Sequence, residues 1–402
     1  MQSPSNQWSI YQFRVLVLLM IIVGATQGFV SPFLSTVLER QHVSPSVNGI
    51  SAAMLYAGMF FSMFFCSKLL KYIGFRKTIL TGIVIMISAI VIFPFTHGTW
   101  WWSGLRFLLG IGDNITTFAV QLWVALYAKA EENGKRFSQF GLSYGLGLGL
   151  GPLGLNLEFI GFWIPFAILT IFLVFFLFFC FFQIQKDIPN SSEDENQNLP
   201  MIPPSYKTVY VVGFLAMWSA FIYGFIEVAI AGNFPVYGLK IGLSKVEISL
   251  LITVFIWMSL LFQIPLGILG DKIGRHKLLT VLCFIGALGM LIIPIIGNDL
   301  VALIFTLGLT GSAVGSMLAM SFAFLSDLLP VSMLARGNLL ATSNFAVGSM
   351  IGPYIGGLLM QHTLIASLFY FLSISLFSFV FFSVLATLSK KGKKAINDIN
   401  MH

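Results

Sequence analysis

Three charged residues lie deep inside long apolar stretches of the sequence, where charges are rare. Arg106 and Asp113 share one of these stretches, and Glu227 lies in another. A charge in a membrane-spanning segment is unfavourable unless it is paired or hydrated, so such side chains face a cavity or one another. A carboxyl group in such a place can take up and release a proton. Asp113 and Glu227 are therefore candidate proton carriers, with Arg106 as a neighbouring cation.

The spacing around Asp113 predicts a polar stripe on one helix. Arg106 and Asp113 are seven residues apart, which places them on one face two turns apart. Thr117 and Gln121 extend this stripe, on which Asn114 is an alternative to Asp113. Two alternatives remain open: a static ion pair between Arg106 and Asp113, and a Glu227 carboxyl that only joins two helices by hydrogen bonds.

The composition indicates that lipid surrounds most of the chain. Of 402 residues, 57% are apolar and only 9% are charged, whereas a soluble domain carries about 25% charged residues. The net charge of +7 comes from cations scattered between apolar runs, which does not indicate nucleic-acid binding. Cys66, Cys180 and Cys283 each lie within an apolar run, and we expect them to be inert packing residues.

Twelve apolar segments are long enough to cross a bilayer as helices. They cover residues 13–36, 46–69, 78–97, 100–127, 137–156, 160–184, 207–238, 244–270, 278–297, 300–325, 337–361 and 363–388. If both termini are cytoplasmic, the outer loops contain only Arg40, Lys240 and Lys245. All other Lys and Arg residues of the loops then lie on the cytoplasmic side. The positive-inside rule therefore predicts cytoplasmic termini.

A polar, acidic and proline-containing stretch divides the chain into two similar halves. We predict a six-helix bundle at 1–184, a cytoplasmic linker at 185–206, a second six-helix bundle at 207–389 and a basic cytoplasmic tail at 390–402. The composition of the linker predicts disorder. Like halves joined by such a linker are typical of transporters built from parallel repeats.

The loop Gly267–Lys277 has the pattern Gly-x-x-x-Asp-Lys-x-Gly-Arg-x-Lys. Its key residues are Gly267, Asp271, Lys272, Gly274 and Arg275. Gly274 allows a tight turn, and Asp271 requires a definite partner, such as Arg275 or a helix N-terminus.

A related loop at 67–77 contains Lys71 at the position of that acid, and also Arg76. The acid is therefore missing from the first copy, and we expect the two gating loops to differ.

Glycine and proline mark two further segments. Gly151-Pro152 ends a run with a glycine at every second position from Gly145, and Gly352-Pro353 lies in the pattern Gly-x-x-x-Gly-Pro-x-x-Gly-Gly. Small residues allow helices to approach closely and proline bends a helix, so we expect hinges at these two sites.

These loops and segments resemble the major facilitator superfamily, whose signature loop is Gly-x-x-x-Asp-(Arg/Lys)-x-Gly-Arg-(Arg/Lys). The element Arg106-x-x-x-Gly110-x-Gly112 is similar to a second family motif. The resemblance implies an all-α membrane fold of twelve transmembrane helices in two pseudo-symmetric six-helix bundles. It also implies a gating role for the signature loop and a cavity lined by the first helix of each half. The run before Gly151-Pro152 resembles a motif of exporters that exchange substrate for protons, as in the drug:H⁺ antiporter group.

A mixed aromatic and amide cavity is expected to accept an amphipathic or weakly cationic organic molecule. Its candidate residues are Gln27, Asn114, Gln121, Trp123, Tyr144, Trp218, Tyr223, Trp257, Gln263 and Asn344. Such a cavity lacks the dense polar groups of a sugar site.

The sequence thus predicts a proton-coupled exporter of small organic molecules in a bacterial cytoplasmic membrane. A proton-coupled importer of a small metabolite and a lipid flippase are the alternatives. We expect a small-molecule substrate, protons and lipid as partners, a monomer, no nucleic acid, no enzymatic activity, no cofactor and no metal site.

Overall fold

The structure is a computed structural model that describes residues 4–127, 133–184 and 206–389. The predicted linker, apart from Tyr206, and the predicted tail lie outside the described residues. Contacts divide the chain into two compact units, residues 1–41 with 50–199 and residues 42–49 with 200–402.

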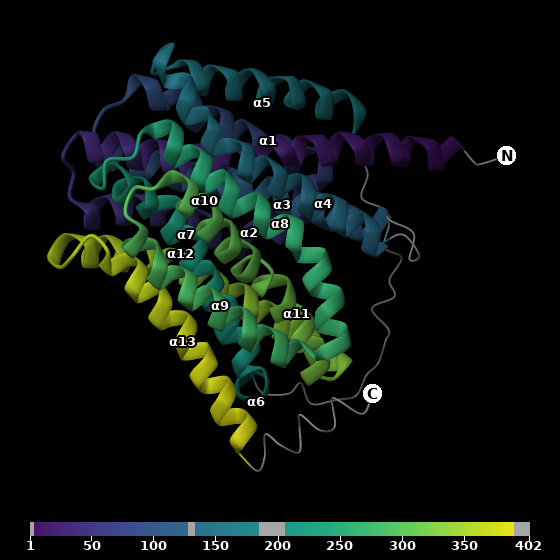
Figure 1. Cartoon of the computed structure of the whole chain (residues 1–402). Coiled ribbons are helices and arrows are strands. Elements are labelled where there is room, and N and C mark those ends of the chain that lie inside the picture. Colours follow the sequence, from purple (N-terminus) through teal and green to yellow (C-terminus); the bar gives the residue numbers. More distant parts are fainter. Residues whose placement is uncertain (1–3, 128–132, 185–205, 390–402) are drawn as a thin grey trace. The chain divides into compact units, whose positions relative to one another are not determined.

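The first unit is built from five α-helices and two 3₁₀ segments (Figure 1). They are α1 (Pro4–Arg40), α2 (Pro45–Ile92, whose first turn is counted with the second unit), η1 (Phe93–Phe95), α3 (Thr99–Tyr127), α4 (Asn133–Leu150), η2 (Gly151–Phe159) and α5 (Ile164–Gln183).

The second unit contains the remaining eight helices. They are α6 (Tyr206–Val212), α7 (Phe214–Lys240), α8 (Lys245–Ile273), α9 (Arg275–Ile296), α10 (Leu300–Val314), α11 (Met317–Leu328), α12 (Val331–His362) and α13 (Ser367–Leu388).

Nine helical stretches within the described residues are long and apolar enough to cross a membrane. One of them, Pro45–Phe95, has 51 residues and bends at Gly74, so it supplies two of the predicted spans. The 32-residue α12 and the continuous run of α4 and η2 cover the two remaining predicted segments. Gly213 and Gly315 interrupt two segments that were predicted as single helices, because α7 begins after the first and α10 ends before the second.

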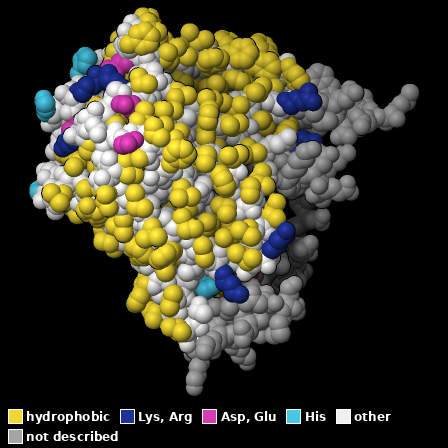
Figure 2. Space-filling model, in the orientation of Figure 1, with side chains coloured by type: hydrophobic (Ala, Val, Ile, Leu, Met, Phe, Trp, Pro, Cys, Tyr) yellow, Lys and Arg dark blue, Asp and Glu magenta, His cyan; other side chains and the backbone are white. Residues whose placement is uncertain are grey.

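Large apolar side chains cover the outer surface of the helices. On α5, Ile171, Phe175 and Phe182 are 66%, 57% and 74% exposed. The face seen in Figure 2 is largely hydrophobic, and its charged side chains lie near the edges. Exposing these apolar side chains to water would be unfavourable, whereas the hydrocarbon core of a bilayer solvates them.

The two halves share the same backbone turns. Gly74 and Gly274 have φ of 79° and 93°, and Gly98 and Gly297 have φ of 103° and 69°. A positive φ is accessible to glycine without steric penalty, so both halves place a glycine with positive φ at corresponding connections between helices.

Close glycine contacts join equivalent helices in each unit. A Cβ atom added at Gly24 on α1 would lie 2.1 Å from the carbonyl oxygen of Tyr144 on α4. The same atom at Gly224 on α7 would lie 2.3 Å from the carbonyl oxygen of Phe345 on α12. The helix pairs α1–α4 and α7–α12 therefore pack backbone against backbone.

Candidate functional site

Asp113 lies on α3 in the interior of the first unit and is 1% exposed. Its carboxylate accepts a hydrogen bond from Thr117 Oγ1 at 3.1 Å on the next turn of α3. Tyr144 Oη, on α4, lies 3.4 Å from the other carboxylate oxygen. Both partners are neutral hydroxyl groups, and among the described residues no cation is in direct contact with the carboxylate of Asp113.

A chain of polar side chains continues from Asp113 across three further helices. Tyr144 Oη is also within hydrogen-bond distance of Gln27 Oε1 on α1. Gln27 Nε2 in turn donates to Tyr56 Oη on α2 at 2.7 Å. Gln27 and Tyr56 are each 6% exposed. The sequence predicted Gln27 and Tyr144 as cavity residues separately, but it gave no signal for Tyr56 or for their connection.

Arg106 is fully buried on α3, two turns before Asp113, and it does not form the ion pair that the sequence left open. Its Nη1 atom donates to Ser51 Oγ on α2 at 2.7 Å. Its Nη2 atom donates to the backbone carbonyl oxygens of Ser31 at 3.0 Å and Val30 at 3.5 Å on α1. The guanidinium therefore joins α3 to α1 and α2.

The other predicted residues of the α3 stripe have different environments. Asn114 is partly buried and donates to Ser62 Oγ on α2 at 2.7 Å. Trp123 is buried, whereas Gln121 is exposed at the surface of the unit. The predicted stripe therefore does not form one site: Asp113 lies in the interior of the unit, Asn114 contacts α2 and Gln121 lies at the surface.

Glu227 lies on α7 of the second unit and is partly buried. Tyr223, one turn earlier on the same helix, hydrogen-bonds its carboxylate. The ring of Tyr223 stacks on Phe345 of α12, with centroids 5.9 Å apart. Glu227 takes the place in α7 that Gln27 takes in α1, each three residues after the close-packed glycine. Both units thus place a polar side chain beside an aromatic residue at equivalent positions.

The remaining predicted cavity residues of the second unit are dispersed. Trp218 donates to Ser378 Oγ at 3.0 Å, and Asn344 Nδ2 donates to the carbonyl oxygen of Leu340 at 2.8 Å. Gln263 is partly buried, and Trp257 is 40% exposed. These four residues do not join the Glu227 environment through a described hydrogen bond.

The signature loop joins three helices of the second unit. Arg275 Nη2 donates to Asp271 Oδ1 at 2.7 Å, which confirms the predicted contact. Arg275 also binds Asp327 on α11 and donates to the carbonyl oxygen of Ala323 at 2.9 Å. Asp327 was missed from the sequence, although an acid at the end of an apolar segment resembles Asp271 and could have been flagged in the same way.

The other predicted loop and hinge residues occupy definite positions. Lys272 and Lys71 are exposed, and the guanidinium of Arg76 lies over the ring of Phe181 at 4.4 Å. Gly267 has no neighbouring atom where a Cβ would be placed. The predicted hinge residues Gly151 and Pro152 lie where α4 ends and η2 begins. The other two, Gly352 and Pro353, lie inside α12.

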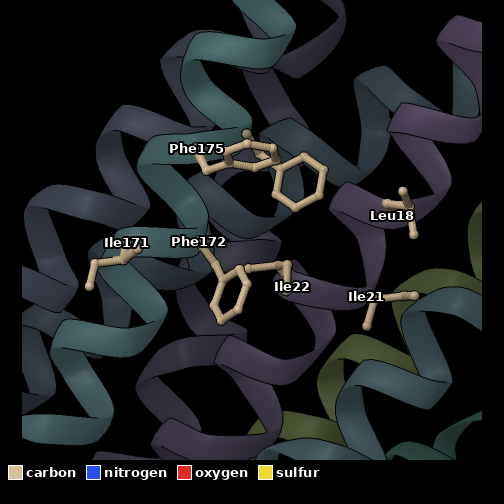
Figure 3. A pocket seen from close by; sticks show the side chains of 7 residues that line it. Leu18, Ile21, Ile22, Ile171, Phe172 and Phe175 are labelled. Carbon is tan, nitrogen blue, oxygen red and sulfur yellow. The ribbon is translucent and has the colours of Figure 1, made fainter.

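An apolar cleft of about 410 Å³ opens between α1 and α5 (Figure 3). Its lining residues are Leu18, Ile21, Ile22, Ile171, Phe172, Phe175 and Phe176. These side chains carry no polar atom that could fix a charged molecule, so the cleft does not change the assignment of the site.

The family model of the Major Facilitator Superfamily matches residues 16–245 and 216–400. The chain belongs to the major facilitator superfamily. It is therefore a multi-pass transporter of the bacterial plasma membrane, in a family whose members bind small molecules, usually use a coupling ion and are generally not enzymes.

Relatives and solved structures agree with this assignment. The chain is 35% identical over 372 residues to the uncharacterised MFS-type transporter YfkF of Bacillus subtilis (strain 168), covering 92% of this chain and 93% of that one. It is 23% identical to the MFS-type transporter Ent638_1421 of Enterobacter sp. (strain 638), covering 88% and 91%. The crystal structure of a D-xylose-proton symporter has a TM-score of 0.76 at 16% identity, covering 94% of this chain and 97% of that one. This likeness shows that the chain has the fold of that transporter.

Proposed function

We propose that this transporter exports small amphipathic organic molecules, preferentially weak cations, in exchange for protons by alternating access. The observation that carries the proposal is the buried Asp113, whose polar partners Thr117 and Tyr144 are both neutral. A carboxyl group in this environment can be neutralised either by a proton or by a cationic substrate. Competition between the two would couple their movements.

Glu227 supplies a second carboxyl group inside an apolar helix, and it lies partly buried in the second unit. Its described hydrogen bond comes from Tyr223, which is also neutral. The aromatic rings of Tyr223 and Phe345 beside it suit the flat apolar part of an organic cation. We assign both carboxyl groups to proton coupling, and we assign Arg106 to holding α3, and therefore Asp113, in place.

The exporter direction rests on the glycine-rich run that ends at Gly151-Pro152. This run resembles the motif of proton-driven exporters, and it packs directly on the helix that carries Gln27. The loop around Asp271 and Arg275 would act as the gate of the second unit. In this cycle protons enter from outside, neutralise the two carboxyl groups and release the substrate as the halves rock.

Purified protein in proteoliposomes with an acidic lumen tests this proposal. Ethidium serves as the cationic probe, and a pH indicator is enclosed in the lumen. We expect added ethidium to accumulate in the lumen while protons leave it. Asp113→Asn should abolish this exchange, and Glu227→Gln should lower the number of protons that leave per ethidium, because neither amide can carry a proton.

Asp299→Asn is the matched control. Asp299 caps α10 by accepting a hydrogen bond from the backbone NH of Ala302 at 3.0 Å, and asparagine can keep that bond. Proton and ethidium moving in the same direction would instead favour the importer. Exchange that is unchanged when both carboxyl groups are replaced would contradict the coupling assignment, and transfer of a labelled lipid by these variants would favour a flippase.

A further inference from the structure

The hydroxyl group of Tyr144 is placed between two acceptors that it cannot satisfy together. It faces Gln27 Oε1 on one side and lies 3.4 Å from Asp113 Oδ2 on the other. A phenol has one proton to donate and can accept through its oxygen. The direction of its hydrogen bonds must therefore depend on whether Asp113 is protonated.

With a proton on Asp113, the chain runs in one direction. The carboxylic acid donates to Tyr144 Oη, Tyr144 donates to Gln27 Oε1, and Gln27 Nε2 donates to Tyr56 Oη. The last two bonds have the direction seen in the structure. Thr117 continues to donate to the other carboxyl oxygen.

Without that proton, the chain reverses. The charged carboxylate can only accept, so Tyr144 turns its proton to Asp113. Gln27 Oε1 then loses its donor, and leaving a buried amide oxygen without a partner is unfavourable. A half-turn of the carboxamide restores both bonds, because Nε2 then donates to Tyr144 Oη and Oε1 accepts from Tyr56.

Other charged groups do not interfere with this reversal. Arg106, on the same helix, is bound by Ser51 and by α1 carbonyl oxygens. On α4 the titratable group facing Asp113 is Tyr144, and on α1 and α2 the chain continues through Gln27 and Tyr56. In the described part of the chain, no ion pair involves Asp113.

The second unit lacks this link at the equivalent place. The carbonyl contact of Gly24 with Tyr144 corresponds to that of Gly224 with Phe345. Phe345 has no hydroxyl group, and Glu227 takes its hydrogen bond from Tyr223 on its own helix. The cross-helix chain is therefore a property of the first unit and not of the shared fold.

We propose that Tyr144 is a positioning residue that transmits the protonation state of Asp113 to Gln27 and Tyr56 by reversing this chain of hydrogen bonds. The inference rests on the proposed function, because it assumes that Asp113 exchanges a proton. Its consequence is that α1 and α2 present opposite hydrogen-bonding groups to the substrate before and after proton release. Tyr144 also supplies the backbone carbonyl of the close α1–α4 contact, since a Cβ atom added at Gly24 would lie 2.1 Å from its oxygen.

Infrared difference spectroscopy of the purified protein between acid and alkaline buffers tests this without any substrate. In the wild type, we expect the carboxyl band of Asp113 to titrate together with tyrosine and glutamine side-chain bands. Asp113→Asn should remove all three together. Tyr144→Phe should remove the tyrosine and glutamine components and change the midpoint of the Asp113 band by about one pH unit.

Two further variants keep the test decisive. Tyr237→Phe removes another buried tyrosine hydroxyl outside the cluster, and it should leave all three components in place. Gln27→Leu breaks the chain at the next residue, so the Asp113 band should persist while the glutamine component disappears. The inference is overturned if tyrosine and glutamine signals remain coupled to Asp113 in Tyr144→Phe, or if Gln27→Leu leaves the spectrum unchanged.

These outcomes are separable from the proposed function. If the tyrosine and glutamine bands titrate with Asp113 but the protein does not exchange ethidium, the inference about Tyr144 holds and the proposed substrate class is wrong. Normal ethidium–proton exchange with no tyrosine or glutamine response would overturn the inference alone.

Discussion

Arg106 and Asp113 show how two buried charges on one helix reach different solutions. The two Nη atoms of the guanidinium donate to a hydroxyl and to two backbone carbonyl oxygens, which do not titrate, whereas its buried Nε atom has no hydrogen-bond partner among the described residues. The carboxyl group is hydrogen-bonded by two hydroxyls, each of which can also accept a hydrogen bond. The first arrangement suits a permanent charge and the second suits a group that gains and loses a proton.

The role of Arg106 in joining helices predicts a large effect of its removal. Arg106→Ala deletes the bonds to α1 and α2, and we expect it to lower the free energy of unfolding by about 3 kcal/mol, since bonds to charged groups are stronger than neutral ones. Ser51→Ala, which removes one acceptor, should lower it by about 1 kcal/mol. Thermal unfolding of the detergent-solubilised protein measures both. Equal unfolding temperatures for the two variants would show that the bonds to α1 contribute little.

The sequence was sufficient to select Asp113, Glu227 and Arg106, because charges inside apolar segments are conspicuous. It could not show that Arg106 and Asp113 have separate partners, because helical spacing gives the face of a residue and not the neighbouring helix. The link through Gln27 to Tyr56 depends on the rotation of four helices about their axes. Asp327 was missed for a similar reason, since its partner Arg275 lies on another helix.

At the scale of elements, the α1–α4 contact depends on glycines that face a backbone. A Cβ atom at Gly147 would lie 1.9 Å from the carbonyl oxygen of Ile21, whereas one at Gly141, on the same helix, has no neighbour within 4 Å. A clash with backbone cannot be relieved by rotating a side chain, so the helices would have to separate. The two glycines therefore form a matched pair for testing the contact.

Alanine substitutions at these two positions should have opposite signs. We expect Gly147→Ala to destabilise the protein by about 3 kcal/mol through overpacking. Gly141→Ala should be neutral or stabilising by about 0.5–1 kcal/mol, because alanine is a better helix former. Thermal unfolding compares them directly. A loss of stability at Gly141 as large as at Gly147 would mean that the effect comes from the helix itself and not from its packing.

The ionic contacts of Arg275 predict unequal effects of its two partners. Asp271 is 59% exposed and Asp327 is 28% exposed, both measured on the side chain. We expect Asp271→Asn to lower stability by less than about 1 kcal/mol, since exposed ion pairs contribute little. Asp327→Asn should have the larger effect, because its charge is less solvated.

Unfolding temperatures at low and high salt measure this difference. Salt screens the exposed pair more than the less exposed pair, so high salt should reduce the effect of Asp271→Asn first. An Asp271→Asn variant less stable than Asp327→Asn would reverse the assigned importance of the two contacts.

The element boundaries were predicted less well than the number of segments. Hydropathy located the apolar segments, but α2 continues beyond the predicted end of its first segment and turns only at Gly74. The breaks at Gly213 and Gly315 were not anticipated, because a glycine inside an apolar run reads equally well as a packing residue. At Gly315 an added Cβ would lie 1.7 Å from Ser259 Oγ, so tertiary packing determines its identity.

At the scale of the whole molecule, each unit carries a carboxyl group deep within an apolar helix. Asp113 and Glu227 do not occupy equivalent positions, since Gln27 is the counterpart of Glu227. The two carboxyl groups therefore have different helices, partners and connections. If each carries one proton per cycle, two protons exchange for one monovalent cation, and one net positive charge moves inward.

This stoichiometry predicts that a membrane potential alone drives export. Moving one charge across 100 mV is worth about 2.3 kcal/mol, which corresponds to about a 50-fold ratio of ethidium outside to inside at equal pH.

Replacing Glu227 by Gln tests the second proton under conditions where Asp113 still exchanges. If that variant retains exchange at all, it should become electroneutral, with a ratio near one at any potential. Proteoliposomes loaded with ethidium and given a potassium diffusion potential, negative inside, measure the ratio against protein-free liposomes. The negative potential inside pulls the ethidium cation inward, so accumulation of ethidium outside can only result from exchange with protons. Wild-type exchange that ignores the potential would reduce the coupling to one proton and leave Glu227 with a role in substrate recognition alone.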